Sequence, residues 1–423
     1  MPTAARFILI GAAMVGTGAL LPQTAVAAPT TTRVSVSSAA AQSNGGSGVG
    51  TVAVSADGRF VAFASDASNL VPGDGNGVLD VFVRDTVSNT TERVSVSSAE
   101  VEGDGPSSAH ALAISPSGRF VTFTSLATNL AAGNDDAICA PDPCPDVYIR
   151  DRTAGTTRML VRFNVFAVNN LALSAGARWY AYDDELLQAV ARCKRATGHC
   201  TDAGVLPPPI KLDTADANAI LGGISRNGRY VLFKKIGFPL PPNTIGGGVF
   251  VRDFTARRTR IVTTHTRDEA DAISANGDVS LFTSSSRKLI RHDTNGKRDV
   301  FVKNRVTGAV HRVSVSSSEH QANRSSFGIA ISADGRYCLF SSKATNLVAG
   351  DTNGRADIFL RDRVLGTTVR VDVSVIGAQA NGNVGPAALS SDGRSAAFQS
   401  FASNLVAGDT NGFRDVFVRG PLH

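Results

Sequence analysis

The chain has 423 residues, 18% of them charged, and a formal net charge of +6 at pH 7. The basic residues recur at regular intervals and form no dense patch interleaved with aromatic side chains, so we expect no nucleic-acid binding. No apolar stretch long enough to span a bilayer follows residue 27, so we expect no membrane insertion.

Residues 1–27 have the pattern of a secretory signal peptide. Arg6 provides a basic start, Phe7–Leu21 is apolar, and Ala25–Ala27 supplies the small residues that precede a cleavage site. A membrane anchor is the alternative, but the apolar run is short and ends at Pro22. The sequence therefore predicts a secreted, extracellular protein, with the cell envelope or periplasm as the other destinations.

Seven copies of one sequence block follow. The first reads VSADGRFVAFAS over Val54–Ser65, and its serine recurs at positions 55, 115, 174, 225, 274, 332 and 390. A period of 49 to 60 residues filled with short apolar runs indicates a repeat architecture, in which each unit packs only against its neighbours. Length alone would suggest two or three domains, but the repeat favours a single domain over residues 28–423.

Each unit contains four runs with the composition of β-strands. In the first unit they are Thr51–Ser55, Arg59–Ser65, Asp80–Asp85 and Thr90–Ser98, which are rich in Val, Ile, Phe or Thr and bounded by turn residues. The second run is apolar on both faces, so it must be covered on both sides. Four-stranded sheets packed against like sheets in a ring meet that requirement. The predicted fold is all-β, a seven-bladed β-propeller.

The two ends of the chain complement each other. The seventh unit stops after its third run, Asp415–Gly420, while Thr30–Ser38 near the N-terminus reads TTTRVSVSS, nearly identical to Thr90–Ser98. We therefore expect the N-terminal segment to supply the missing fourth strand of the last blade. Pairing the two ends leaves no open strand edge at the junction.

The block S-x-D-G-R followed by a D-V-F-V-R-D strand resembles the WD40-like repeat of TolB-type β-propellers. The resemblance covers about Arg33 to Gly420, and the third unit departs most, with Ala177 and Arg178 where the others read Gly-Arg. It implies the propeller fold. It implies little about activity, because such propellers serve as binding scaffolds and as accessory domains of peptidases.

The connections between the runs fall into two classes. Those after the first and third runs are tight turns such as Asp57-Gly58, whereas those after the second and fourth are long, as in Asp66–Asp80 and Gly377–Gly385. In an up-and-down blade the two long classes emerge on the same face, called here the long-loop face. We expect a binding surface there.

An acidic element, D-x-N-G-x-x-D, recurs in these loops. Clustered carboxylate and amide oxygens suit Ca²⁺, but the spacing is not that of an EF-hand and no Glu closes the loop. The favoured alternative is an Asn-Gly turn whose Asp side chains accept loop N–H groups, so calcium is a candidate cofactor and none is certain. The candidate residues are Asp74, Asn76, Asp80, Asp293, Asn295, Asp299, Asp351, Asn353, Asp357, Asp409, Asn411 and Asp415.

A Gln-x-Asn element recurs in the loops after the fourth run, on the same face. It comprises Gln42 and Asn44, Gln321 and Asn323, and Gln379 and Asn381. Should these loops meet the acidic elements between adjacent blades, they would form a repeated pocket lined by oxygen atoms.

Five cysteines are present, and export permits disulfides. The close spacings predict two local bridges, Cys139–Cys144 and Cys193–Cys200. A zinc site made of these four is less favoured, because the spacings fit no common zinc finger. Cys338 lies within an apolar strand and is expected to be a free core thiol.

No catalytic residue is assigned, since the chain lacks G-x-S-x-G, H-E-x-x-H and P-loop motifs. The seven histidines show no metal-ligand spacing; they are His110, His199, His265, His292, His311, His320 and His423. We expect a secreted, non-catalytic binding or scaffold propeller that engages a protein or glycan through its long-loop face. The alternative is a lyase or glycosidase with its site at the mouth of the central channel, which paired carboxylates or a His–Asp pair on the axis would favour.

Overall fold

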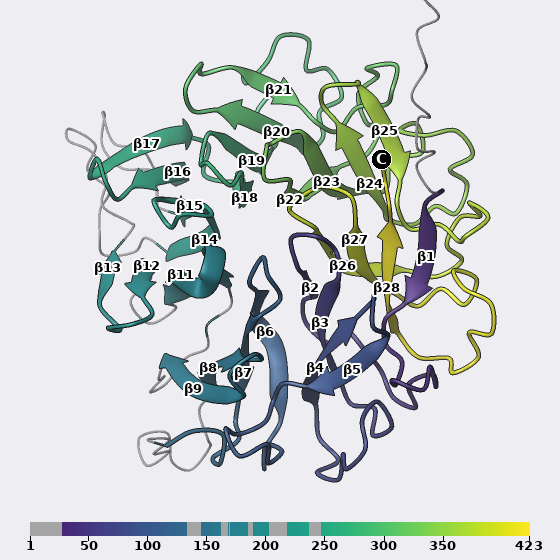
Figure 1. Ribbon diagram of the computed structural model, residues 1–423. Coiled ribbons are helices and arrows are strands. Elements are labelled where there is room, and N and C mark those ends of the chain that lie inside the picture. The colour runs from purple at the N-terminus through teal and green to yellow at the C-terminus, as the bar shows by residue number, and fades with distance from the viewer. Residues whose placement is uncertain are drawn as a thin grey trace, which may run out of the picture.

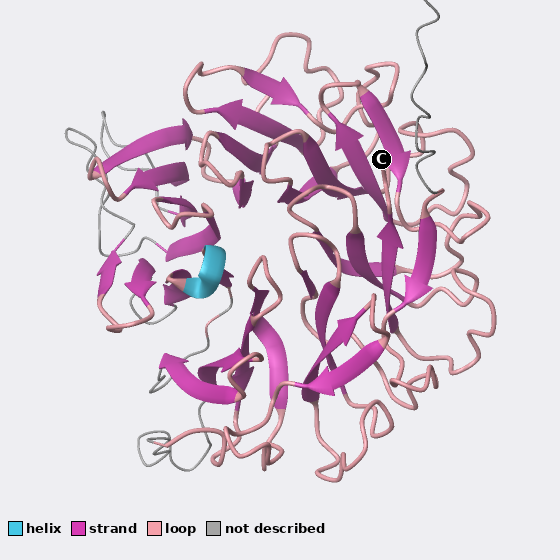
Figure 2. Ribbon diagram, in the orientation of Figure 1, coloured by secondary structure: helices cyan, strands magenta, loops and turns pink. Residues whose placement is uncertain are grey.

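The computed structural model describes residues 28–132, 145–161, 168, 170–184, 189–202, 218–236 and 247–423. Seven four-stranded antiparallel sheets stand around a common axis (Figure 1). Almost all regular structure is strand, and the one helical segment among the described residues is a 3-10 turn, η2 (Ala175–Ala177), near the axis (Figure 2). The predicted all-β, seven-bladed propeller is confirmed.

The first four blades take their strands in chain order, from the axis outwards. Blade 1 contains β2 (Ala53–Val54), β3 (Phe60–Ser65), β4 (Asp80–Asp85) and β5 (Thr90–Arg93). Blade 2 contains β6 (Ser107–Ile114), β7 (Phe120–Ser125), β8 (Asp146–Asp151) and β9 (Thr156–Val161). Blade 3 contains β10 (Leu171–Leu173), β11 (Trp179–Asp184), β12 (Ala189–Lys194) and β13 (Cys200–Asp202). Blade 4 contains β14 (Asn218–Ile224), β15 (Tyr230–Ile236), β16 (Gly247–Asp253) and β17 (Arg258–Thr263).

The remaining three blades include the two ends of the chain. Blade 5 contains β18 (Glu269–Ile273), β19 (Val279–Ser284), β20 (Asp299–Asn304) and β21 (Val310–Arg312). Blade 6 contains β22 (Ser326–Ile331), β23 (Tyr337–Ser342), β24 (Asp357–Asp362) and β25 (Thr367–Arg370). Blade 7 contains β26 (Val384–Leu389), β27 (Ala396–Ser400), β28 (Asp415–Gly420) and β1 (Thr30–Arg33).

Strand β1 forms the outer edge of blade 7. It pairs antiparallel with β28, with Thr30 opposite Gly420 and Arg33 opposite Phe417, so the two ends of the described chain lie side by side (Figure 1). Beyond the strand, the backbone N–H of Val34 donates to the carbonyl of Val416 at 2.7 Å. The sheet position that the seventh repeat leaves open is thus filled by N-terminal residues.

The core lies between neighbouring blades. One cluster, for example, joins Val81 and Val83 of blade 1 to Val121 and Phe123 of blade 2. In every blade except blade 3, the second and third strands each bring an aromatic ring into such a layer, as in the stacked pair Phe63–Phe82 with centroids 6.0 Å apart. Both faces of these strands are buried, as their two-sided apolar pattern predicted.

The S-x-D-G blocks form the tight turns nearest the axis. In blade 1 the Ser55 hydroxyl donates to Asp57 and accepts from the N–H of Phe60. These turns also hydrogen-bond to one another through their backbones, from Ala56 to the carbonyl of Pro116 and from Asp392 to the carbonyl of Ala56. The latter bond joins blade 7 to blade 1.

The fourth strands are shorter than the sequence predicted. β5 ends at Arg93, although the pattern continues to Ser98. The V-S-V-S-S segment leaves the sheet because its polar groups bond elsewhere: Ser95 donates to Asp80 at 2.5 Å, and the carbonyl of Ser97 accepts from Arg150 of the next blade at 3.2 Å. This segment therefore joins neighbouring blades instead of extending the sheet.

Candidate functional site

The four acidic elements of the long-loop face each close around an arginine. Both aspartates of an element contact the guanidinium of the arginine that ends the fourth strand of the same blade. The N–O distances are 3.2 Å (Arg93–Asp74) and 3.1 Å (Arg93–Asp80) in blade 1, and 3.1 Å (Arg312–Asp293) and 3.7 Å (Arg312–Asp299) in blade 5. They are 3.3 Å (Arg370–Asp351) and 3.8 Å (Arg370–Asp357) in blade 6, and 3.2 Å (Arg33–Asp409) and 3.6 Å (Arg33–Asp415) in blade 7. The protein itself thus supplies a positive charge to each acidic pair.

The central asparagine of each element holds the loop. In blade 1, the Asn76 amide donates to Asp80 at 3.1 Å and to the carbonyl of Gly103 at 2.9 Å, while its oxygen accepts the N–H of Val78. Asn295, Asn353 and Asn411 make the corresponding bonds in their blades. The twelve residues therefore fall into four sets, each organised as an asparagine turn. The loop N–H group is accepted by the asparagine oxygen and not, as expected from the sequence, by the aspartates, which pair with arginine. Calcium binding at these sets stays a prediction.

Blade 1 adds a third carboxylate. Glu102 contacts the Arg93 guanidinium at 2.6 Å, and the ligand atoms of Asp74, Asp80 and Glu102 lie within 4.8 Å of one another. Burial, followed by the charge of Asp80, raises the pKa of Asp74. Arg93 contacts all three carboxylates, so a positive charge of the protein already lies beside every member of the cluster.

The Gln-x-Asn loops contact the acidic elements within a blade through glutamine and the long loop of the next blade through asparagine. Gln42 donates to Asp409 at 3.1 Å within blade 7, and Asn44 exchanges hydrogen bonds with Ser68 in the long loop of blade 1. Asn323 and Asn381 make equivalent reciprocal contacts. These bonds fix each long loop to the next blade, so the long-loop face is preorganised before any partner arrives.

Blade 6 contains a carboxyl pair that the sequence analysis did not identify. Where three other repeats place a serine that donates to the second aspartate of the acidic element, blade 6 has Asp372 facing Asp357. Both side chains are buried, and burial together with the charge of Asp357 raises the pKa of Asp372 well above its ordinary value. The sequence shows this difference, because blade 6 has V-D-V-S-V where the three other repeats begin V-S-V-S.

An apolar groove lies on the long-loop face between blades 6 and 7. Its cavity of about 520 Å³ is lined by Val375, Ile376, Leu405 and Val406, among others. Ile376 is 91% exposed, the highest value among the large hydrophobic side chains of the described residues. In the three other repeats that share this loop, the two positions hold Ser-Ala or Ser-Ser, as in Ser317-Ser318, so among these four loops the apolar pair occurs only here.

A second cavity, of about 390 Å³, lies on the axis of the ring and receives residues from the innermost strands or flanking segments of all seven blades. Its lining includes the polar side chains of His110, Asn170 and Asp271. His110 is exposed, and glycines line the wall beside Asp271. Among the seven histidines, only His110 lines this cavity.

Asp271 is held in an unusual environment. Its carboxylate accepts a 2.7 Å hydrogen bond from Thr283, and it lies against Gly328 of blade 6, where a Cβ would come within 2.1 Å of the carboxylate oxygen. Burial and, more weakly, the charge of Glu269 raise the pKa of Asp271 to about 7, against the opposing Thr283 bond. The carboxylate of Asp183 lies behind the cavity wall, where it accepts hydrogen bonds from Asn170 and from the N–H of Leu221, two residues that line the cavity.

The cysteine predictions are partly answered. Cys193 and Cys200 lie opposite each other on β12 and β13 and form a disulfide, with Cα atoms 4.0 Å apart. Cys338 is free and buried, and burial raises its pKa to about 12. Cys139 and Cys144 lie outside the described residues, as do residues 1–27 with the predicted signal peptide. Within the described part of the chain, no helix has the length and apolarity to cross a membrane.

Neither a protein-family model nor a curated protein sequence matches the chain. Solved structures do resemble it. The β-propeller domain of the Trilobed protease from Pyrococcus furiosus aligns with 88% of this chain and 93% of that chain, at 9% identity and a TM-score of 0.54. An oligogalacturonate lyase in complex with manganese aligns with 94% of each chain, at 11% identity and a TM-score of 0.53.

TolB from Acinetobacter baumannii is also similar, with 11% identity and a TM-score of 0.40 over 69% of this chain. The aligned part spans 59% of that TolB. The two likenesses with TM-scores above 0.5 establish the fold alone, because their identities are 9% and 11%. The β-propeller that the repeat's resemblance to TolB-type proteins implied is therefore confirmed.

Proposed function

We propose that this protein is a non-catalytic binding propeller that holds a protein partner on its long-loop face, in the groove between blades 6 and 7. The observation that carries the proposal is the exposed pair Val375 and Ile376 beside Leu405 and Val406. Exposed apolar patches mark interaction sites, and an apolar lining suits a protein side chain better than a glycan. The disulfide Cys193–Cys200 agrees with function outside the reducing cytosol.

The fixed loops around the groove support this function. Asp409 lines the groove while paired with Arg33, and Asn404 of the rim is bonded to the carbonyl of Gln379. A surface that is already ordered loses little conformational entropy on binding, so more of the contact energy appears as affinity.

Replacing Val375 and Ile376 together by serine should abolish partner capture while leaving the fold intact. The change installs the residues found at the equivalent positions Ser317 and Ser318. Truncating central apolar anchors costs roughly 2 kcal/mol or more of binding free energy, or about thirtyfold in Kd. The mature chain, residues 28–423, would be used to capture partners from the culture medium of its source, followed by titration calorimetry with the purified partner.

A matched control is available on the opposite face. Val364 and Leu365, in the tight turn after β24, are 71% and 68% exposed, and their double serine variant removes similar apolar surface. It should bind like the unmodified chain. Equal binding by the groove variant, or equal loss in both variants, would exclude the groove as the docking site.

A catalytic role at the channel is the second candidate, because Asp271 and His110 line one cavity and the Asp271 pKa is raised to about 7. A carboxyl group that titrates near neutrality can act as a general acid or base. The similarity to an oligogalacturonate lyase suggests acidic oligosaccharides as the first substrates to test.

Under this second function, Asp271→Asn should lower turnover of an acidic oligosaccharide by at least about a hundredfold, the contribution of one general acid or base. Reducing-end assays and ultraviolet detection of unsaturated products would measure it. Ile220→Val, a change in the same cavity that leaves Asp271 and the Asn170–Asp183 hydrogen bonds in place, separates catalysis from general damage to the channel. No turnover by the unmodified chain, or unchanged turnover in Asp271→Asn, removes the enzymatic candidate.

A further inference from the structure

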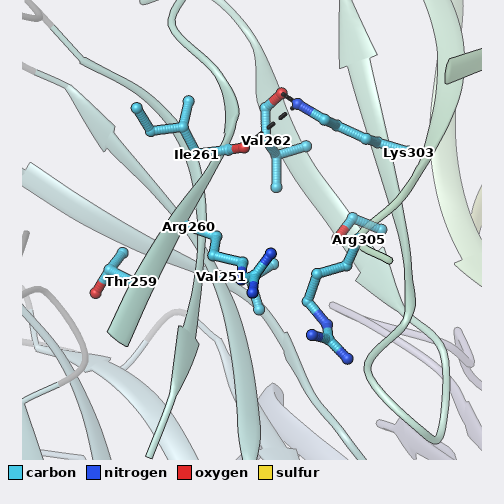
Figure 3. Close-up of a pocket in the computed structure, with 8 residues that line it drawn as sticks. Val251, Thr259, Arg260, Ile261, Val262, Lys303 and Arg305 are labelled. Carbon is cyan, nitrogen blue, oxygen red and sulfur yellow. Dashed lines mark hydrogen bonds between the residues drawn. The ribbon is translucent and has the colours of Figure 1, made fainter. Parts of the chain in front are cut away.

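A cationic pocket of about 330 Å³ opens between blades 4 and 5 (Figure 3). Its basic side chains are Arg260 from β17, Lys303 from β20 and Arg305 just after β20. The guanidinium groups of Arg260 and Arg305 extend into the same space (Figure 3). Val251, Ile261 and Val262 provide apolar wall, and the volume lies within the range of about 300–1,000 Å³ that is usual for small-molecule sites.

The junction between blades 1 and 2 shows how an acid closes the equivalent position. Glu92 on β5 is the equivalent of Arg260, since each faces the same valine of its third strand, Val83 or Val251. Glu92 forms an ion pair with Arg152, the equivalent of Arg305 in the next blade. Between blades 4 and 5 the acid is replaced by a base, so two like charges face an open pocket.

Lys303 adds a third cation without a counter-ion. The equivalent arginines of two other blades contact acids, Arg150 with Glu100 and Arg361 with Glu319. Lys303 instead donates to the backbone carbonyls of Ile261 and Val262, at 3.3 and 2.8 Å, and contacts no described carboxylate. Burial lowers the pKa of Lys303.

The charges within the pocket do not cancel. Arg305 is paired with Asp278 and also donates to the carbonyl of Gly277. Arg260 is exposed and forms no ion pair with a described residue. Three cations therefore share one carboxylate, and an anion in the pocket would reduce their mutual repulsion.

We propose that this pocket binds a small organic carboxylate, with the carboxylate between Arg260 and Arg305 and an apolar chain against Val251, Ile261 and Val262. A guanidinium pair recognises a planar carboxylate through paired N–H donors, and the aliphatic wall selects a ligand with carbon atoms behind the charged group. The site is separate from the long-loop groove and does not depend on the function proposed there.

The test titrates the mature chain with hexanoate, acetate and inorganic phosphate, using saturation-transfer NMR and calorimetry. Hexanoate should bind at least about tenfold more tightly than acetate, because its chain buries several CH₂ groups that acetate lacks. Arg260→Glu, which recreates the Glu92–Arg152 arrangement, should weaken hexanoate binding by at least about tenfold, since a charge-assisted bond becomes a repulsion.

Two measurements keep the result independent of folding. Arg260→Glu should not lower the melting temperature, because the new carboxylate can pair with Arg305. Arg158→Glu makes the same change at the equivalent strand position of blade 2, where Cys193 stands in place of the lysine, and it should leave hexanoate binding unchanged. Undiminished binding by Arg260→Glu, tighter binding of phosphate than of hexanoate, or no hexanoate binding at millimolar concentration would each overturn the proposal.

Discussion

Deleting Thr30–Ser38 from a chain of residues 28–423 should lower its stability severely and make it prone to aggregate. The deletion removes strand β1 and with it Arg33, which contacts the buried carboxylates of Asp409 and Asp415. Leaving buried charges without their partner costs roughly 3–5 kcal/mol, before the loss of the strand pairing and of buried Val34 is counted. The exposed edge of β28 would then be free to pair with other chains.

Thermal melting followed by circular dichroism, together with light scattering, would measure both effects. The double variant Thr30→Ala and Thr32→Ala is the control, because both side chains are exposed on β1 and their truncation leaves the strand in place. It should melt near the unmodified chain. A deletion variant that melts as the full mature chain does would mean that β1 contributes little to the ring.

Replacing Asp372 by serine should stabilise the protein by roughly 1–3 kcal/mol at pH 7 and above, the usual penalty for a buried unsatisfied polar group. The variant installs the residue of the other repeats, where Ser95 donates to Asp80 and Ser314 donates to Asp299. In blade 6 the two facing carboxyls leave one oxygen of each without a hydrogen-bond partner.

The pH dependence of this gain has a defined sign. The pKa of Asp372 is raised in the folded state, so the folded chain retains a proton that the unfolded chain releases above about pH 4. Stability from this group is therefore complete at low pH and is lost as pH rises towards the folded pKa. Asp372→Ser should remove that loss of stability. The difference in the free energy of unfolding between the variant and the unmodified chain should therefore grow with pH.

Denaturant melts between pH 4 and pH 8 would reveal this trend. Ser314→Asp, the reverse change in blade 5, places a carboxyl opposite Asp299 and should reproduce the destabilisation. A variant Asp372→Ser that is less stable than the unmodified chain at pH 8 would show that blade 6 needs both acids.

The acidic elements show where prediction from the sequence reached its limit. Calcium binding by their residues stays a prediction. Their Asn-Gly turn was predicted, because such a turn is specified by neighbours within a few residues. Their counter-ions were not, although an arginine ends the fourth strand in each of these blades. Arg33 is far from Asp409 in sequence, and only the pairing of β1 with β28 brings the two charges together.

The groove between blades 6 and 7 and the cationic pocket between blades 4 and 5 were missed for a related reason. Val375 and Ile376 stand where the similar loops have Ser or Ala, and Arg260 stands where blade 1 has Glu92. Each departure acquires meaning only from what the adjacent blade places opposite it, such as Arg305 for Arg260. Comparing the repeats position by position would have identified the residues but not the cavities.

The sequence by itself determined the number of blades, their strand order, the tight and long classes of loops, and the candidate strand for the last blade. All of these follow from local patterns repeated at a fixed period, because each strand's composition and each turn's residues act over short distances. The tertiary structure decided which charges neutralise one another, why Asp271 titrates near neutrality, and where pockets open between blades. Those properties depend on burial and on distances between blades, and neither quantity is encoded in any single repeat.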